Sequence, residues 1–248
     1  ADLVVFDDLK DFRARRVLSE GRVVAEDGEY VGPRRAPPAP PGSGVQVKWD
    51  AVSVAVEVSG AARARVIHAI PGQIVTGQSV ETLKLEDGQA VADPDRDLLK
   101  IAVIERHRAT GNVGVGFVKG FGLKRGAIAS SVAHDNHNIV VVGASDADML
   151  AAARAVAETN GGQAVVADAR ILAGVPLPIG GLMSDLPLED VKERVAAMTR
   201  AARELGGTLP DPLMTMSFLA LAVIPELKIT DLGLVDVKEF HPVPLFVA

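Results

Sequence analysis

Between residues 98 and 177 the sequence repeats one simple pattern, in which a short apolar run is followed by a turn and then by another short apolar run. Each run has the length of a strand rather than of a helix, and Gly, Asn and Asp residues separate the runs. The runs cover residues 98–104, 113–118, 127–133, 139–143, 163–167 and 171–177. Because they follow one another with few helices between them, we expect a mainly antiparallel sheet of about six strands.

Helical patterns occur at three places. The first helix is expected over residues 145–159, where the hydroxyl of Ser145 can cap its first turn. The second is expected over residues 187–205 and should end at Gly206. Its apolar face consists of Leu188, Val191, Val195 and Met198. A third, shorter helix is expected around residues 213–221, so the sequence predicts the α+β class, with helices flanking the sheet.

The beginning of the chain differs in composition from the rest. Residues 1–31 form a small β-hairpin unit that turns at Glu20-Gly21, and alone this unit is too small to hold a core. Residues 32–44 are rich in proline, which fixes φ and removes amide donors, so an extended linker is expected there. The main α+β domain then covers residues 45–248. Near its start, residues 52–58 alternate with the period of a half-buried strand.

The composition argues against several classes of protein. Of the 248 residues, 48% are hydrophobic and 23% are charged, which predicts a folded core. The net charge of −6 argues against nucleic-acid binding, because affinity for phosphates needs clustered cations. The chain has no cysteine, which leaves no disulfide, zinc–thiolate site or thiol nucleophile. No apolar run approaches the roughly 20 residues of a membrane helix, and the N-terminus lacks a signal-peptide pattern, so we expect a soluble, cytoplasmic protein.

The densest polar cluster lies in residues 130–138, between two of the expected strands. It contains Ser130, His134, Asp135 and His137. A loop between strands can present functional side chains on a rigid scaffold, and the two histidines with Asp135 could ligate a metal ion. A turn closed by Asp and Asn side chains accounts for the same composition. The residues alone leave both interpretations open.

Two further polar groups adjoin apolar strands. Glu105 and His107 follow the run 98–104, and a carboxylate beside an imidazole can transfer a proton, although we favour a solvated strand end. Lys119 lies in a Gly-rich stretch, where Gly120-x-Gly122 invites comparison with a phosphate loop. The spacing fits neither a Walker nor a dinucleotide motif. The sequence also has no His-x-His pair and no Gly-x-Ser-x-Gly motif.

One long stretch carries a specific resemblance. Residues 111–119 read GNVGVGFVK and residues 133–138 read AHDNHN. Together with residues 105–107, the whole of 111–138 closely resembles the C-terminal region of the bacterial adenine deaminases, which belong to the amidohydrolase superfamily. The similarity extends to residues 70–76, 175–185, 211–221, 224–228 and 243–247. The first nine residues are similar to the strand that returns from an amidohydrolase barrel, so residues 1–31 would be a remnant of the small β domain.

The resemblance implies a hydrolase of purine salvage that converts adenine and water to hypoxanthine and ammonia. In the family this reaction takes place at a manganese or iron centre in a (β/α)₈ barrel. The barrel and its metal ligands would lie upstream of Ala1, so no catalytic or metal-binding residue of the family has a matching position in this chain. The isolated chain is then expected to be inactive.

The same resemblance implies how the chain would contribute to the enzyme. It would act as a lid, an interface or a support for the substrate site, in a homo-oligomer and together with the barrel domain. Candidates for residues near the substrate are Ser130, His134, Asp135, His137, Glu105, His107 and Lys119. The alternative is a binding or interaction module without catalysis.

Overall fold

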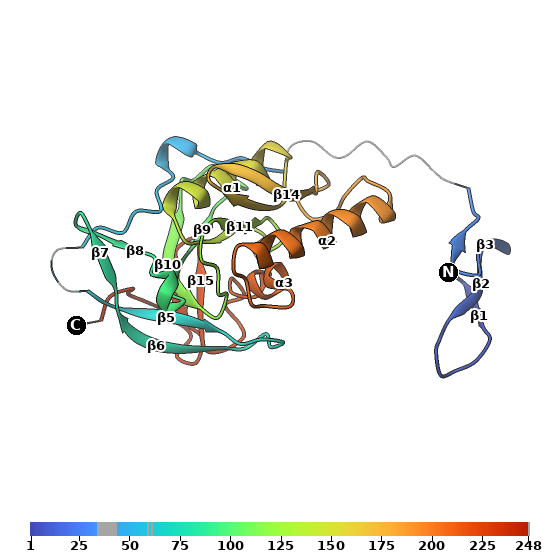
Figure 1. The fold of residues 1–248 in the computed structure, drawn as a ribbon, viewed down its shortest axis with the longest axis horizontal. Helices are drawn as coiled ribbons and strands as arrows, with labels where there is room; N and C mark the ends of the chain where they lie inside the picture. The colour runs from blue at the N-terminus through green and yellow to red at the C-terminus, as the bar shows by residue number, and fades with distance from the viewer. Residues whose placement is uncertain (34–43, 59, 61, 248) are drawn as a thin grey trace. The chain divides into compact units, whose positions relative to one another are not determined.

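The computed structural model describes residues 1–33, 44–58, 60 and 62–247. Contacts within the chain divide it into two compact units, Ala1–Ala39 and Pro40–Ala248 (Figure 1). Most of the expected proline-rich linker, residues 34–43, lies outside the described residues, and the predicted assignment of domains stays a prediction.

The first unit is a four-stranded antiparallel sheet in the order β1-β2-β3-β4. Its strands are β1 (Leu3–Phe6), β2 (Ala14–Ser19), β3 (Arg22–Glu26) and β4 (Glu29–Tyr30). The predicted hairpin is confirmed, because Ser19 pairs with Arg22 and the two residues between them, Glu20 and Gly21, have φ of 50° and 73°. No residue from 1 to 33 is buried, as expected for a unit too small to form a core.

The second unit is built on an eight-stranded sheet in the order β14-β13-β11-β12-β9-β10-β5-β6 (Figure 1). The strands are β5 (Arg63–Ala69), β6 (Thr76–Thr82), β9 (Leu99–Ile104), β10 (Val113–Lys119), β11 (Ala127–Ser130), β12 (Ile139–Gly143), β13 (Gly162–Ala167) and β14 (Arg170–Pro176). Neighbouring strands are antiparallel except β5 and β10, which are parallel. The α+β class and the mainly antiparallel sheet are confirmed.

The number of strands was underestimated, because the expected sheet had about six. The two additional strands are β5 and β6, which extend the sheet beyond β10. Strand β6 has the sequence TGQSVET, and its side chains alternate between more and less exposed positions at the sheet edge. Because this strand is largely polar, it lacks the apolar run by which the other strands were found.

Three α-helices lie at the predicted positions: α1 (Asp146–Glu158), α2 (Leu188–Glu204) and α3 (Pro212–Ser217), of which α3 is shorter than expected. The Ser145 hydroxyl accepts a hydrogen bond from the Asp148 amide and caps α1 as predicted. In the predicted apolar face of α2, Met198 is buried but Leu188 and Val195 are exposed. The reason is that α2 packs mainly against the edge strand β14. Its buried residues lie in its C-terminal half, and in the N-terminal half Val191 packs on the core while remaining partly exposed.

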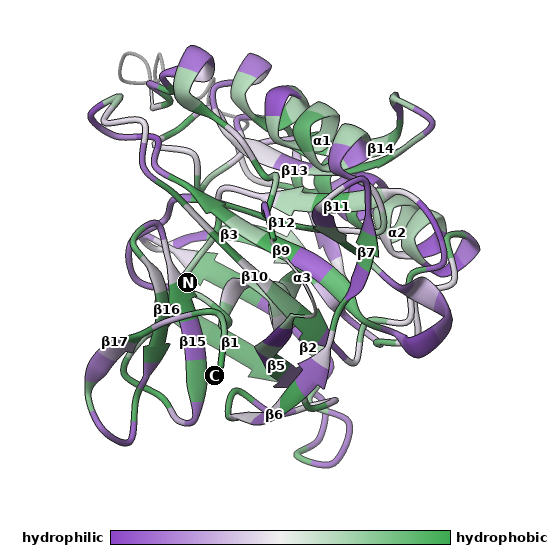
Figure 2. Ribbon diagram, turned by 90° about the vertical axis from the view of Figure 1, so that its left-hand side faces the viewer, coloured by the Kyte–Doolittle hydropathy of each residue, from purple (hydrophilic) through white to green (hydrophobic). Residues whose placement is uncertain are grey.

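The central strands are buried on both faces. In β9, Ile101 and Val103 join a hydrophobic cluster that includes residues of α2 and α3, whereas Ala102 and Ile104 join a cluster that includes residues of α1. Figure 2 shows β9, β10 and β12 mainly in the green of hydrophobic residues. Because successive side chains of a strand point to opposite faces, covering both faces produces a continuous apolar run.

Two smaller sheets complete the second unit. Strands β15 (Leu227–Thr230), β16 (Gly233–Asp236) and β17 (His241–Val243) form an antiparallel sheet, in which β15 and β16 pack on β10. Strands β7 (Lys84–Glu86) and β8 (Gln89–Val91) form a hairpin. Short 3₁₀ helices occur at Trp49–Ala51 (η1) and Pro94–Arg96 (η2).

The strand predicted for residues 52–58 is wrong. Val54 and Val56 are buried, as the alternating pattern indicated, but no ladder forms along this segment. Glu57 makes only an isolated bridge to Gln89. The alternation therefore reflects packing of an extended segment on the domain rather than strand pairing. Among the described residues, no helix has the length and apolar character to cross a membrane.

Candidate functional site: the histidine loop

Two loops leave the main sheet at the same end. Ile104, the last residue of β9, pairs with Ile139, the first residue of β12, and β11 ends beside them at Ser130. Residues 131–138, here called the histidine loop, therefore lie next to the segment that follows β9. The Nε2 atom of His107 is 2.7 Å from the carbonyl oxygen of Asn136, which links the two segments directly.

The structure thus brings most of the candidate residues to one end of the sheet. Those gathered there are Ser130, His134, Asp135, His137, Glu105 and His107. Lys119 lies at the opposite end of β10, where it pairs with His68 of β5. Its Nζ atom forms an ion pair with Glu81 at 2.6 Å. Lys119 therefore has a partner on β6 and does not adjoin the histidine loop.

Glu105 shapes the turn that follows β9. Its carboxylate accepts hydrogen bonds from the amides of His107, Arg108 and Thr110, at 2.5, 2.8 and 2.9 Å. Burial by itself would raise the pKa of Glu105, but these amide hydrogen bonds outweigh it, so the pKa lies below its usual value. The side chain is buried rather than solvated, contrary to the strand end we favoured from the sequence.

Ser130 and Ser131 also bind main-chain groups. The Ser130 hydroxyl accepts from the amide of Val132 at 3.0 Å, and the Ser131 hydroxyl donates to the carbonyl of Gly181 at 2.6 Å. Both serines are buried. Ser130 therefore stabilises the local turn, and Ser131 holds the start of the histidine loop against the segment at Gly181.

His134 and His137 form an imidazole pair, with ring centroids 5.8 Å apart. The His134 ring also packs on Phe218, at 4.6 Å between centroids. The Nδ1 atom of His137 accepts from the amide of Ala133 at 3.3 Å, so the proton of the neutral ring lies on Nε2. Burial, with the nearby charges of His134 and Arg106, holds the pKa of His137 below 6.5. Neutral imidazoles of this kind can donate and accept hydrogen bonds at neutral pH.

Sequence reasoning missed Arg106, which lies between two candidate residues. Its side chain is 1% exposed, and its guanidinium donates to the carbonyls of His137 at 2.5 Å, of Gly180 at 3.0 Å, and of Gly44. The local signal was an arginine at the exit of an apolar strand. Its contact with residue 180 could not be read from the sequence, because the two residues are distant along the chain.

Asp231 was also missed. Its two carboxylate oxygens accept from the side-chain amides of Asn138 and Asn112, each at 3.2 Å. Asp231 lies in the turn between β15 and β16, so it ties that small sheet to the histidine loop. Nothing in the local sequence marks this pairing.

The Gly-rich stretch after β10 holds a carboxylate of the chain itself. The amides of Gly120 and Gly122 donate to the two carboxylate oxygens of Asp97, at 2.8 and 2.7 Å. The amides that a phosphate loop would offer to a ligand are therefore occupied, in agreement with the rejection of that motif.

The structure places no third ligand beside His134 and His137 that would complete a metal site in the described part of the chain. Within the described ranges, no group of three or more His, Asp or Glu side chains is placed to hold a metal ion. Asp135 is exposed, while His134 and His137 are half-buried. The residues present do not fit the manganese or iron centre that the resemblance implies.

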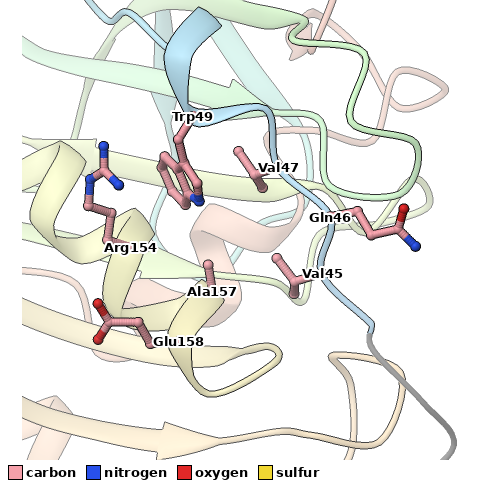
Figure 3. Close-up of a pocket in the computed structure, with 7 residues that line it drawn as sticks. All are labelled: Val45, Gln46, Val47, Trp49, Arg154, Ala157 and Glu158. Carbon is pink, nitrogen blue, oxygen red and sulfur yellow. The ribbon is translucent and has the colours of Figure 1, made fainter.

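A separate open cavity of about 370 Å³ lies between α1 and the segment around η1 (Figure 3). It is lined by Val45, Gln46, Val47, Trp49, Arg154, Ala157 and Glu158. The Arg154 guanidinium lies over the Trp49 ring, 4.4 Å from the centroid of the ring. None of the candidate residues lines this cavity.

Comparison with known proteins decides the family. A family model described as the adenine deaminase C-terminal domain matches residues 73–241, more than half of the chain. This chain belongs to the adenine deaminase C-terminal domain family. The resemblance found in the sequence is therefore confirmed.

Adenine deaminases from several organisms match almost all of this chain. Adenine deaminase of Desulfatibacillum aliphaticivorans is 51% identical over 247 residues, 99% of this chain and 43% of that protein. Adenine deaminase of Methanothrix thermoacetophila is 46% identical, again over 99% of this chain and 43% of the relative. That of Brucella anthropi is 48% identical over 97% of this chain and 42% of the relative. The chain thus spans less than half the length of these curated relatives.

Proposed function

We propose that this chain is the C-terminal part of an adenine deaminase, a hydrolase that converts adenine and water to hypoxanthine and ammonia in purine salvage. The observation that carries the proposal is the 51% identity to an adenine deaminase over 99% of the chain. In the reaction, the water oxygen bonds to the ring carbon that carries the amino group, and that group leaves as ammonia. The enzyme would act in the cytoplasm.

We further propose that the metal chemistry belongs to a barrel domain outside this chain. Manganese or iron would be bound there, as the resemblance to the amidohydrolase superfamily implies. No step through a metal is therefore assigned to residues of this chain. By itself the chain would not deaminate adenine.

A chimera tests the assignment. The matching 43% of the Desulfatibacillum aliphaticivorans enzyme would be replaced by this chain, and hypoxanthine formation would be measured. We expect activity from the chimera and none from this chain or from the truncated relative alone. A chimera that folds and binds metal but forms no hypoxanthine would contradict the proposal.

The histidine loop is proposed to face the substrate of the complete enzyme. The imidazole pair is half-buried, the pKa of His137 is lowered by burial, and residues from several elements hold the pair. A neutral imidazole can donate a hydrogen bond to a purine ring nitrogen or orient the attacking water. Asp135, exposed in the same loop, would favour one tautomer of a neighbouring imidazole.

Separate His134→Asn and His137→Asn variants of the active chimera test this role. Asparagine tolerates the left-handed backbone of His137, where φ is 50°, so the loop can keep its shape. We expect kcat/KM for adenine to fall at least about tenfold in one variant, as for loss of a proton donor or positioning group. The matched control is His241→Asn, at an exposed imidazole of β17. Wild-type kinetics in both loop variants would show that the loop is structural.

An interaction role is the second candidate. In the first unit Leu3, Leu9 and Phe12 are 64%, 76% and 61% exposed. Exposed apolar side chains on a small sheet favour association with another chain or domain. This observation supports a homo-oligomer, and it would also fit a binding module without catalysis. The chimera separates the two, because a pure interaction module would leave deamination unrestored.

A further inference from the structure

Two buried cations without an acidic partner lie near the histidine loop: Arg106 contacts His137, and Lys228 contacts Phe218, whose ring packs on His134. Three basic side chains are at most 1% exposed, namely Lys100, Arg106 and Lys228. Lys100 forms an ion pair with Asp146 at 2.8 Å. Arg106 and Lys228 form none in the described part of the chain, and main-chain carbonyls accept their hydrogen bonds.

Arg106 fixes the position of His137 by binding the main-chain carbonyl of that residue. Its Nε atom donates to the carbonyl of His137, while its terminal nitrogens donate to Gly44 and Gly180. A Cβ atom on Gly181 would lie 2.7 Å from these nitrogens, so the guanidinium lies directly against that glycine. The left-handed conformation of His137 is thereby fixed at its carbonyl by a donor with a rigid, planar geometry.

Lys228 holds the other imidazole through Phe218. Its Nζ atom donates to the carbonyl of Phe218 at 3.1 Å and to that of Ile74 at 2.9 Å. The Phe218 ring packs on His134, and the amide of His134 donates to the carbonyl of Ser217 at 3.0 Å. Lys228 thus fixes the end of α3 on which His134 rests.

Carbonyls satisfy the donors of these two cations but do not neutralise their charge. Burying such a charge is costly unless it is paired. Carbonyls from five segments, at Gly44, Ile74, His137, Gly180 and Phe218, converge on the two side chains. Apolar residues could not hold these carbonyls, since they offer no donors.

We propose that Arg106 and Lys228 are positioning residues that keep the His134–His137 pair adjacent, and that Arg106 places a fixed positive charge beside His137. The charged groups that face His137 are His134 and Asp135 of its own loop and Arg106 and His107 of the segment after β9. Of these, only Asp135 favours protonation of His137. A role of the His134–His137 pair in deamination rests on the proposed function, whereas the arrangement of the two imidazoles by Arg106 and Lys228 does not.

Imidazole titration by NMR, on the 248-residue chain without adenine, tests the proposal. In Arg106→Gln we expect the pKa of His137 to rise toward its usual value, because a nearby positive charge is removed. Arg106→Lys keeps the charge and should keep the low pKa. In Lys228→Met we expect loss of the nuclear Overhauser contacts between the Phe218 and His134 rings.

Arg125→Gln is the matched control, because Arg125 is exposed and pairs with Asp168 at 3.0 Å. It should leave the His137 titration and the contacts between the Phe218 and His134 rings unchanged. The proposal is overturned if Arg106→Gln leaves the His137 titration as in the wild type, or if Lys228→Met retains the ring contacts. Should the Gln variant fail to fold, a high His137 pKa in folded Arg106→Lys overturns it equally. Failure of the chimera to deaminate adenine would not affect this result.

Discussion

Two buried lysines in strands differ in the groups that bind their ammonium groups. Lys100 of β9 and Lys228 of β15 are both fully buried. Lys100 contacts the carboxylate of Asp146, whereas Lys228 contacts the carbonyls of Ile74 and Phe218. Burial lowers the pKa of Lys228 from 10.5 to about 8. That lowering corresponds to roughly 3 kcal/mol of unfavourable burial of the charged form.

Lys228→Met should remove a pH dependence of stability. Between pH 8 and 10.5 the unfolded chain still binds the lysine proton that the folded chain has lost. The free energy of unfolding of the wild type therefore rises with pH in this window, by up to about 3 kcal/mol relative to the variant. Urea unfolding at pH 7.5 and pH 10 measures the difference. Exposed Lys124→Met is the control, and an equal pH response in all three proteins would contradict the expectation.

The packing of the β15–β16 turn on β10 explains why β10 is rich in glycine. Gly114 of β10 faces the turn between β15 and β16, and a Cβ atom there would lie 2.0 Å from the carbonyl oxygen of Thr230. Backbone cannot move aside as a flexible side chain can. The Gly-rich pattern of β10 therefore reflects the close approach of the small sheet, and no ligand is needed to explain it.

Gly114→Ala should destabilise the second unit by about 2–3 kcal/mol or more, because the β15–β16 turn must shift to admit the methyl group. The matched control is Gly77→Ala in β6, where the added Cβ would meet His68 at an ordinary 3.5 Å. Chemical denaturation of both variants gives the comparison. Equal stability of the Gly114→Ala and Gly77→Ala variants would show that the β15–β16 turn does not pack closely against Gly114.

At the scale of the whole molecule, the two units differ sharply in burial. The strands β9, β11 and β12 are buried along their whole length, whereas residues 1–33 contain no buried side chain. Hydrophobic burial is the main favourable contribution to folding, so the first unit has little to stabilise it by itself.

Hydrogen exchange should therefore be fast across residues 3–26 and slow in the central strands of the second unit. Mass spectrometry of the 248-residue chain can measure both regions in one experiment. The second unit serves as the internal control. In the active chimera we expect protection of residues 3–26 to increase if another domain or subunit covers them. Slow exchange of these residues in a monomer of this chain would contradict the expectation.

Local structure and family could be determined from the sequence because the interactions that specify them lie close together in it. The cap of α1 at Ser145 and the turn at Glu20-Gly21 involve residues a few positions apart. The apolar runs identified the central strands because both of their faces are buried. The long stretch 111–138 pointed to the family that comparison confirmed.

Tertiary structure alone decided what the candidate residues contact. Glu105 is buried because the turn at Thr110 folds over it. Lys119 does not lie near the other candidate residues, because it is at the far end of β10 from the histidine loop. Residues 52–58 alternate like a strand but make only the isolated bridge between Glu57 and Gln89, whereas polar β6 pairs with β5 along its whole length. Arg106 and Lys228 became buried through contacts with segments far away along the chain. Such contacts depend on long-range packing, which local pattern and propensity do not encode.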